Sequence, residues 1–252
     1  MFGLQRWQVE NTVKLIDEGN TIPFIARYRK EAHGTLDDQV LRELSEKLEY
    51  LRNLDKRREE ISASITAQEK MTPEIEAALE KASTLAEIED IYRPFRPKRR
   101  TRASIAKEKG LEPLADAIFA QVADSASPTE LAADYIDAEK GVETAEDAIN
   151  GAMDIIAENI SDDADIRRRL RSLFTVAGVL QSRAADSEKE SVYTMYYEYD
   201  EPVNKIAGHR VLAVNRGENE GLLKVGIDVD RIKALNIINA NVLSDNVSAC
   251  TD

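Results

Sequence analysis

The sequence has one cysteine, Cys250, so it can form no internal disulfide and no thiolate metal cluster. This sparing use of cysteine fits the reducing cytoplasm, where we expect the protein to act. Long apolar runs are also missing, since no segment approaches the roughly 18 consecutive apolar residues that a membrane-spanning helix needs. The first residues lack a basic stretch followed by an apolar core, so no secretion signal is predicted.

Aromatic residues are scarce as well, at 6% of 252 residues, and there are 11 glycines. This composition favours a mainly helical protein over a β-sandwich or β-barrel. Positive charge is in deficit, because 34 lysines and arginines face 47 aspartates and glutamates and leave a net charge of −13. Such a balance argues against a surface coated with nucleic acid, but it does not exclude a local basic patch.

Signals for helix starts and stops recur along the first 178 residues, so the fold class is predicted as mostly α with many helices. Leu41, Leu44, Leu48 and Leu51 follow helical spacing and begin a predicted helix of about 30 residues, or about 45 Å, which would act as a spine between subdomains. Hydroxyl residues that can cap the starts of helices are Thr35, Thr72, Thr84, Ser127, Thr144 and Ser161.

The pattern changes after residue 178. Residues 192–199 are rich in strand formers, and residues 223–229 alternate with a period of two. Residues 183–191 are polar and are predicted as an exposed loop, whereas residues 239–252 show no packing pattern. We therefore predict a helical region over residues 1–178 and the start of a small α+β element, expected to be truncated, over residues 179–252.

Motifs for common enzyme classes are absent. There is no GxxxxGK[ST] phosphate loop and no GxGxxG turn, and neither His33 nor His209 lies in an HExxH or HxH pattern. We expect both histidines to have supporting roles, His33 in a loop and His209 at a helix start. The sequence thus predicts no enzyme and no bound metal or cofactor.

The strongest departure from the background is a run of positive charge that starts after Tyr92. Only Glu108 opposes these charges, and Pro94 and Pro97 favour an extended backbone along which basic side chains could contact phosphates while Phe95 or Tyr92 stacks on a base. The alternative is an ordered linker whose arginines pair with neighbouring acidic helices. Such a run also matches nuclear-localisation patterns. Its members, called the basic strip below, are Arg93, Arg96, Lys98, Arg99, Arg100, Arg102, Lys107 and Lys109.

A second basic group, called the N-terminal basic cluster, consists of Arg27, Arg29 and Lys30. It follows Phe24 and Ile25, which we expect to be packing residues, so its cations could either contact nucleic acid or bridge carboxylates on neighbouring helices.

A third basic group, residues 167–171, lies three residues beyond several aspartates, and this spacing favours a salt-bridged helix surface. Two predicted short helices joined by Gly110-Leu111 could form a helix-turn-helix.

Several long strings resemble the Tex family of bacterial transcription accessory proteins in the same order, over essentially the whole chain. They are residues 17–31 (DEGNTIPFIARYRKE), 93–102, 110–115, 137–142, 209–213 and 216–218. The resemblance implies an elongated, mainly helical cytoplasmic protein that binds nucleic acid and acts in transcription without being an enzyme. It also implies a relation to a eukaryotic transcription elongation factor.

Tex proteins continue into a ribonuclease-H-like domain, a helix-hairpin-helix region and an RNA-binding barrel, and we find no pattern for these here. We therefore expect the N-terminal helical part of such a protein. Its expected partners are nucleic acid, RNA or DNA, bound through phosphates, and the transcription machinery. The alternative is a structural scaffold or protein-docking module that leaves nucleic-acid binding to other domains.

Overall fold

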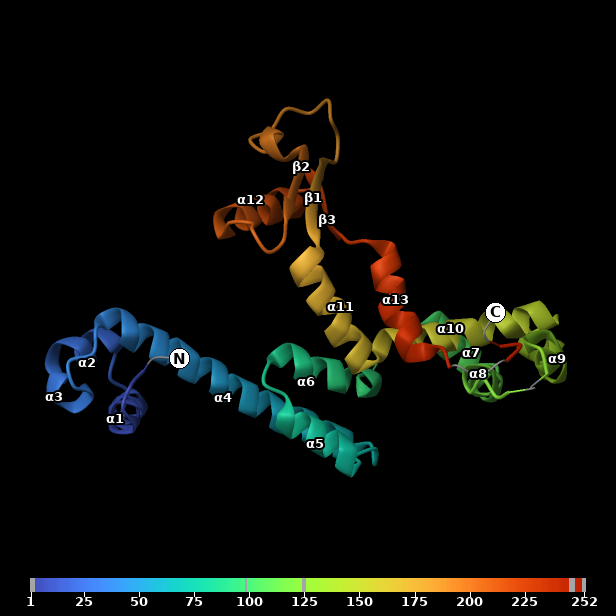
Figure 1. Ribbon diagram of the computed structural model, residues 1–252, viewed down its shortest axis with the longest axis horizontal. Helices are drawn as coiled ribbons and strands as arrows, with labels where there is room; N and C mark the ends of the chain where they lie inside the picture. Colours follow the sequence, from blue (N-terminus) through green and yellow to red (C-terminus); the bar gives the residue numbers. More distant parts are fainter. Residues whose placement is uncertain (1–2, 98, 124–125, 245–247, 251–252) are drawn as a thin grey trace. The chain divides into compact units, whose positions relative to one another are not determined.

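The computed structural model describes residues 3–97, 99–123, 126–244 and 248–250. The chain divides into two compact units, Met1–Tyr92 and Arg93–Asp252 (Figure 1). The fold is mostly α with a small α+β element, as predicted. The change from helices to strands lies inside the second unit, where the first strand begins at Val179.

The first unit is organised around α4 (Asp38–Ala67), a helix of 30 residues that has the predicted length and is called the spine below (Figure 1). Helices α1 (Arg6–Asp17) and α2 (Ile22–Tyr28) contact α4, and the short α3 (Lys30–His33) packs against α1 and α2. Helices α5 (Pro73–Lys81) and α6 (Leu85–Tyr92) also contact α4. The apolar side of α4 buries Leu41, Leu44, Leu54, Ile61 and Ile65.

The start of α4 differs from the sequence prediction. Its N-cap is Asp37, and Thr35 instead donates its hydroxyl to the carbonyl of Gly34. Gly34 ends α3 in the left-handed conformation and Thr35 also has a positive φ of 57°. The chain therefore turns sharply before α4, and Thr35 lies too far back to cap it.

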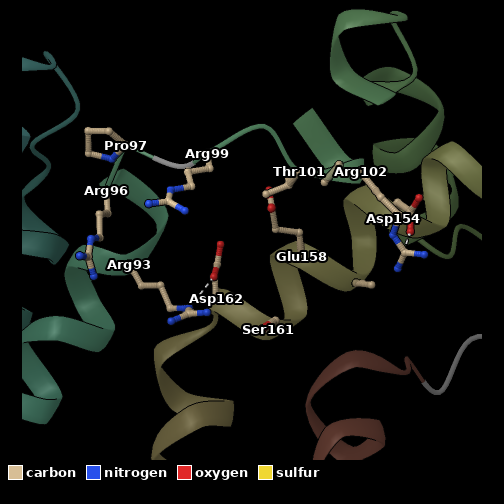
Figure 2. Close-up of a pocket in the computed structure, with 12 residues that line it drawn as sticks. Arg93, Arg96, Pro97, Arg99, Thr101, Arg102, Asp154, Glu158, Ser161 and Asp162 are labelled. Atoms are coloured by element: carbon tan, nitrogen blue, oxygen red, sulfur yellow. Dashed lines mark hydrogen bonds and ion pairs between the residues drawn. The ribbon is translucent and has the colours of Figure 1, made fainter. Parts of the chain in front are cut away.

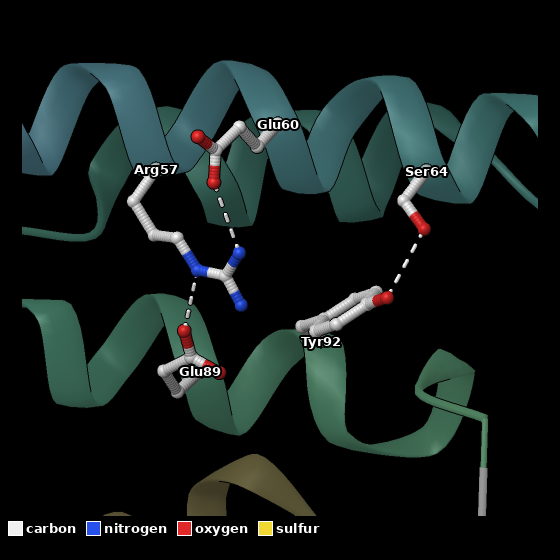
Figure 3. Close-up of polar contacts among 5 residues, drawn as sticks. All are labelled: Arg57, Glu60, Ser64, Glu89 and Tyr92. Carbon is white, nitrogen blue, oxygen red and sulfur yellow. Dashed lines mark hydrogen bonds and ion pairs between the residues drawn. The ribbon is translucent and has the colours of Figure 1, made fainter.

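Polar contacts join α4 to α6 (Figure 3). Arg57 donates from Nε to Glu89 at 2.6 Å and from Nη1 to Glu60 at 3.1 Å, and these hydrogen bonds raise the pKa of Arg57 above its ordinary value. The hydroxyls of Ser64 and Tyr92 lie 3.1 Å apart. Together these contacts fix the α6 end of the unit on the spine.

The second unit has a helical half centred on α10 (Ala145–Asp162). Helices α7 (Arg102–Glu108), α8 (Glu112–Phe119) and α9 (Pro128–Ala132) pack on it. Small residues such as Ala103 and Ala152 are buried where these helices meet, and a Cβ added at Gly151 would lie 2.3 Å from the side chain of Leu111. This site therefore requires glycine for close packing. Short 3-10 turns are Arg93–Phe95, Ala133–Tyr135, Ala138–Lys140 and Thr194–Tyr196.

The predicted caps at Thr72, Thr84, Ser127 and Thr144 are all confirmed. The prediction for Ser161 is wrong, because α10 continues through Asp162. The next helix, α11 (Ala164–Ala177), is capped by Asp163, whose carboxylate accepts the N–H of Ile166 at 2.8 Å.

The α+β element is an antiparallel sheet of β1 (Val179–Ala184), β2 (Glu198–Pro202) and β3 (Leu223–Asp228), in the order β2-β1-β3. Leu180 pairs with Glu201 on one side and Ile227 on the other. Helix α12 (Gly208–Asn219) packs against β3 and buries Val214 with Tyr193 and Tyr196.

Strand β3 was predicted, but β1 was not, and residues 183–184 belong to it rather than to a loop. Residues 194–196 form a 3-10 turn instead of a strand. Helix α13 (Arg231–Val242) includes residues 239–242, which showed no packing pattern in the sequence. Among the described residues, no helix combines the length and apolar character that crossing a membrane requires.

Candidate nucleic-acid interface

The basic strip starts with a 3-10 turn, continues through an irregular segment and ends on α7. Pro94 lies in the turn Arg93–Phe95, so the predicted extended backbone is wrong at that position. Thr101 caps α7 in a reciprocal box with Ser104, and this cap fixes where the irregular segment meets the helix. Lys98, also predicted to bind nucleic acid, lies outside the described residues.

An open cleft of about 640 Å³ separates the strip from α10 (Figure 2). Four arginines line its strip side, and three carboxylates of α10 line the other. These residues are Arg93, Arg96, Arg99 and Arg102, opposite Asp154, Glu158 and Asp162. The charged residues that line the cleft are therefore nearly balanced, four cations against three carboxylates.

Among the described residues, two ion pairs of unequal burial attach the strip to α10. Arg93 donates from Nε to Asp162 at 2.8 Å, and the Asp162 side chain is only 8% exposed. Arg102 lies 3.2 Å from Asp154, with its own side chain 85% exposed. The first pair holds the strip in place, whereas the second is open to solvent and can be exchanged for a phosphate at little expense.

Other cations of the strip have solvent-exposed partners. Arg100 lies 3.6 Å from Glu108, and Lys107 lies 2.7 Å from Glu112. Lys109 donates to the carbonyl of Gly141 at 2.7 Å. Pairs this exposed contribute at most about 1 kcal/mol, so they compete weakly with a phosphate.

Arg96 and Arg99 are exposed, and neither has an ion-pair partner among the residues the structure describes. Figure 2 shows both guanidinium groups on the strip side of the cleft. They are the best placed cations of the strip for an external anion.

The N-terminal basic cluster lies in the first unit. Ile25 is fully buried and anchors α2, but Phe24 is exposed, so the expectation that Phe24 packs inside is wrong. Arg27, Arg29 and Lys30 are exposed and form no ion pair with any carboxylate in the described parts of the chain. Their predicted bridging of neighbouring helices is therefore not seen there. An aromatic pair four residues apart, beside two arginines, was the signal that could have revealed an exposed face.

The third basic group forms the predicted salt-bridged surface. On α11, Arg168 and Arg169 both pair with Asp165, and the hydrogen bond from Arg168 lowers the pKa of that carboxyl group. Arg167 donates to the carbonyl of Ser161.

The two histidines lie in different helices. His209 is the second residue of α12, as predicted, whereas His33 ends α3 rather than lying in a loop. His33 is fully buried; its Nδ1 accepts the N–H of Leu36 at 3.0 Å, so Nε2 carries the proton and donates to the carbonyl of Ile25. No group of three or more potential metal ligands occurs among the described residues.

Comparison with known proteins finds two family models along the chain. Residues 1–66 match the Tex-like protein N-terminal domain, and residues 123–247 match the Tex central region-like model. "Protein tex" of Bordetella pertussis is 44% identical over 232 residues, which cover 90% of this chain and 29% of the relative.

Two further relatives have informative names. "Transcriptional accessory protein Tex" of Neisseria gonorrhoeae is 40% identical, over 87% of this chain and 29% of the relative. "S1 RNA-binding domain-containing protein 1" of Homo sapiens is 30% identical, over 90% of this chain and 23% of the relative. The chain thus spans less than a third of the length of these three relatives.

Proposed function

The chain belongs to the Tex family of transcription accessory proteins, and on that premise we propose that it is a non-catalytic nucleic-acid-binding module acting in transcription. The observation that carries the proposal is the exposed basic strip, in which Arg96 and Arg99 have no ion-pair partner among the described residues. The names of two relatives support the same role, since one refers to transcription and the other to RNA binding. The module would act in the cytoplasm and contact the transcription machinery.

The proposed contacts are with phosphates and are independent of sequence. Helices α7 and α8 have the order of a helix-turn-helix, with Gly110 in the turn at a φ of +84°. However, the exposed side of α8 carries Glu112 and Asp116, which the phosphates along a DNA groove would repel. We therefore assign binding to the strip and α7 rather than to α8.

The test is fluorescence anisotropy with labelled single-stranded RNA and duplex DNA. About four phosphate contacts predict a log–log salt slope of about −3 to −4 between about 50 and 200 mM salt. Alanine at Arg96, Arg99 and Arg100 should flatten the slope by about 2 to 3 and weaken all sequences alike. Arg93 is left intact because it holds the strip through buried Asp162.

The control replaces Arg168 and Arg169 by alanine, which removes two positive charges, one fewer than the strip variant, from a salt-bridged surface in the same unit. This control should retain the wild-type slope. A folded strip variant that binds with unchanged affinity and slope would contradict the proposal.

A structural scaffold or protein-docking role is the second candidate, and the ion pairs between the strip and α10 favour it. In that case the wild-type chain would bind nucleic acid negligibly at about 150 mM salt. The strip variant, which keeps Arg93 and Arg102, would then change neither binding nor the melting temperature, whereas alanine at Arg93 and Arg102 would lower the melting temperature.

A further inference from the structure

Helix α2 presents two aromatic rings to solvent beside two arginines. Tyr28 is 58% exposed and Phe24 is 37% exposed, and their ring centroids lie 5.3 Å apart at an interplanar angle of 44°. Arg29 lies over the Phe24 ring at 5.5 Å, and Arg27 lies 6.0 Å from the centroid of Tyr28. These four residues are called the aromatic–arginine surface.

The backbone beneath this surface is rigidly held. Ile25, next to Phe24 on α2, is fully buried, and its carbonyl accepts a hydrogen bond from buried His33. Pro23 fixes the first turn of the helix. The rings are therefore presented by an ordered helix, so a ligand that binds them would not have to order the chain first.

The charges of the surface are available to a ligand. Within the described residues, Arg27 and Arg29 contact aromatic rings and form no ion pair with a carboxylate. A guanidinium over a ring keeps its N–H groups free to point outward, where they can donate to phosphate oxygens. The surface thus combines flat apolar faces with donors for an anion.

We propose that the aromatic–arginine surface binds one or two unpaired nucleotides of a single-stranded nucleic acid, with bases stacked on Tyr28 and Phe24 and phosphates held by Arg27 and Arg29. Each base has an apolar face next to an anionic group, and this matches the rings and cations on α2. A duplex is a poor fit because its base faces are already stacked. An acidic peptide would satisfy the arginines but would leave the two rings exposed.

This inference rests on the proposed function for its class of ligand, which is nucleic acid. It assigns a different site, in the other unit, and adds a preference for unpaired strands.

The test uses the full chain and a single-stranded RNA that carries 2-aminopurine, with the matching duplex for comparison. Phe24→Leu with Tyr28→Leu keeps apolar bulk and removes the rings. The matched control is Phe119→Leu, an exposed phenylalanine on α8 without a cation over its ring among the described residues.

The double leucine variant should weaken single-strand binding by about fivefold or more and abolish the change in 2-aminopurine fluorescence, with less than about a twofold effect on the duplex. The Phe119 variant should behave as wild type. Arg27→Ala with Arg29→Ala should flatten the single-strand salt slope by about 1 to 1.5.

Unchanged single-strand binding by the folded double leucine variant would overturn this inference and would point to a protein partner for the surface. Equal loss on single strand and duplex would overturn it too. Failure of the basic strip gives a different result: alanine at Arg96, Arg99 and Arg100 would then leave binding intact, while the aromatic variant still lost the 2-aminopurine signal.

Discussion

Arg93 donates from Nε to the buried carboxylate of Asp162, 69 residues later in the chain, at 2.8 Å. Arg93 begins the basic strip, and Asp162 ends α10. The pair therefore joins the basic strip to the central helix of the same unit. Arg93 was predicted to contact nucleic acid, but this geometry gives it first a positioning role.

Removal of Arg93 should destabilise the second unit. Arg93→Ala leaves Asp162 without this hydrogen bond in a site of low exposure, and we expect the free energy of unfolding to fall by about 1–3 kcal/mol. Urea unfolding followed by far-UV circular dichroism measures the change. Arg102→Ala is the control, because its pair with Asp154 is far more exposed and should contribute at most about 1 kcal/mol. Equal losses in both variants would contradict a special role for Arg93.

Two neighbouring arginines on α4, Arg57 and Arg58, should also make unequal contributions to the free energy of unfolding. Arg58 donates to the carbonyls of Leu79 and Ala82, each at 2.9 Å, at the C-terminal end of α5. Arg58→Met should lower the free energy of unfolding by about 1–3 kcal/mol because it removes partners from backbone acceptors. Arg57→Met loses carboxylate pairs that are partly exposed and a contact of its guanidinium with the Tyr92 ring at 5.7 Å, and should lose about 1 kcal/mol. The thermal midpoints of the two variants give the comparison.

The helix starts were readable from the sequence where cap and partner lie three residues apart. Thr144 and Asp147 bond each other reciprocally, and no other part of the fold is needed to recognise them. The predicted cap at Ser161 was wrong because α10 continues past this serine. Asp163, two residues later, caps α11 instead. Strand β1 was not predicted because only Gly178 separates it from α11, and no turn signal marks where the strand begins.

Only part of each candidate site could be predicted from the sequence. The basic residues themselves could be identified from the sequence, but the partner of Arg93 lies 69 residues away and no local pattern connects the two. Phe24 was misjudged because burial depends on which face of α2 the other helices cover, and they cover Ile25. Tertiary packing, rather than helix propensity, decided both outcomes.

The capping box of α10 should make stability depend on pH. The Asp147 carboxylate accepts the hydroxyl of Thr144 at 2.9 Å and the backbone N–H of Thr144 at 3.0 Å, and these bonds lower the pKa of Asp147. A lowered pKa contributes stability above the unfolded value of about 4, and that stability is lost as the pH falls through the lower folded value. The difference in melting temperature between wild type and Asp147→Asn should therefore be largest near neutral pH and shrink in acid.

Thr144→Val provides the control for that pH dependence, since it removes the hydroxyl that makes the largest contribution to the lowered pKa of Asp147. Combined with Asp147→Asn, it should add little further pH dependence. A melting-temperature difference that stayed constant from neutral pH into acid would show that the carboxylate charge does not stabilise the start of α10.

Alanine substitutions at two glycines of the first unit, both with positive φ, allow the cost of backbone strain to be compared with the cost of a steric conflict. Gly19 has a φ of +83° and nothing within 4 Å of an added Cβ, whereas Gly34 has a φ of +66° and an added Cβ would lie 2.7 Å from the ring of Trp7. Gly19→Ala should cost about 1 kcal/mol for the left-handed backbone alone. Gly34→Ala should cost about 1–3 kcal/mol more, because Trp7 must move.

Trp7 is the only tryptophan in the sequence, so its fluorescence reports directly on this site in the first unit. Urea unfolding followed at the tryptophan emission should give a lower midpoint for Gly34→Ala than for Gly19→Ala, together with a shifted emission maximum before unfolding. If both variants had the same midpoint and wild-type emission, the packing of Trp7 against Gly34 would not stabilise the turn between α3 and α4.

The same turn sets the position of His33, which bonds to the carbonyl of Ile25 and so positions α2. Gly34→Ala should therefore also weaken single-strand binding at the aromatic–arginine surface, whereas Gly19→Ala should not.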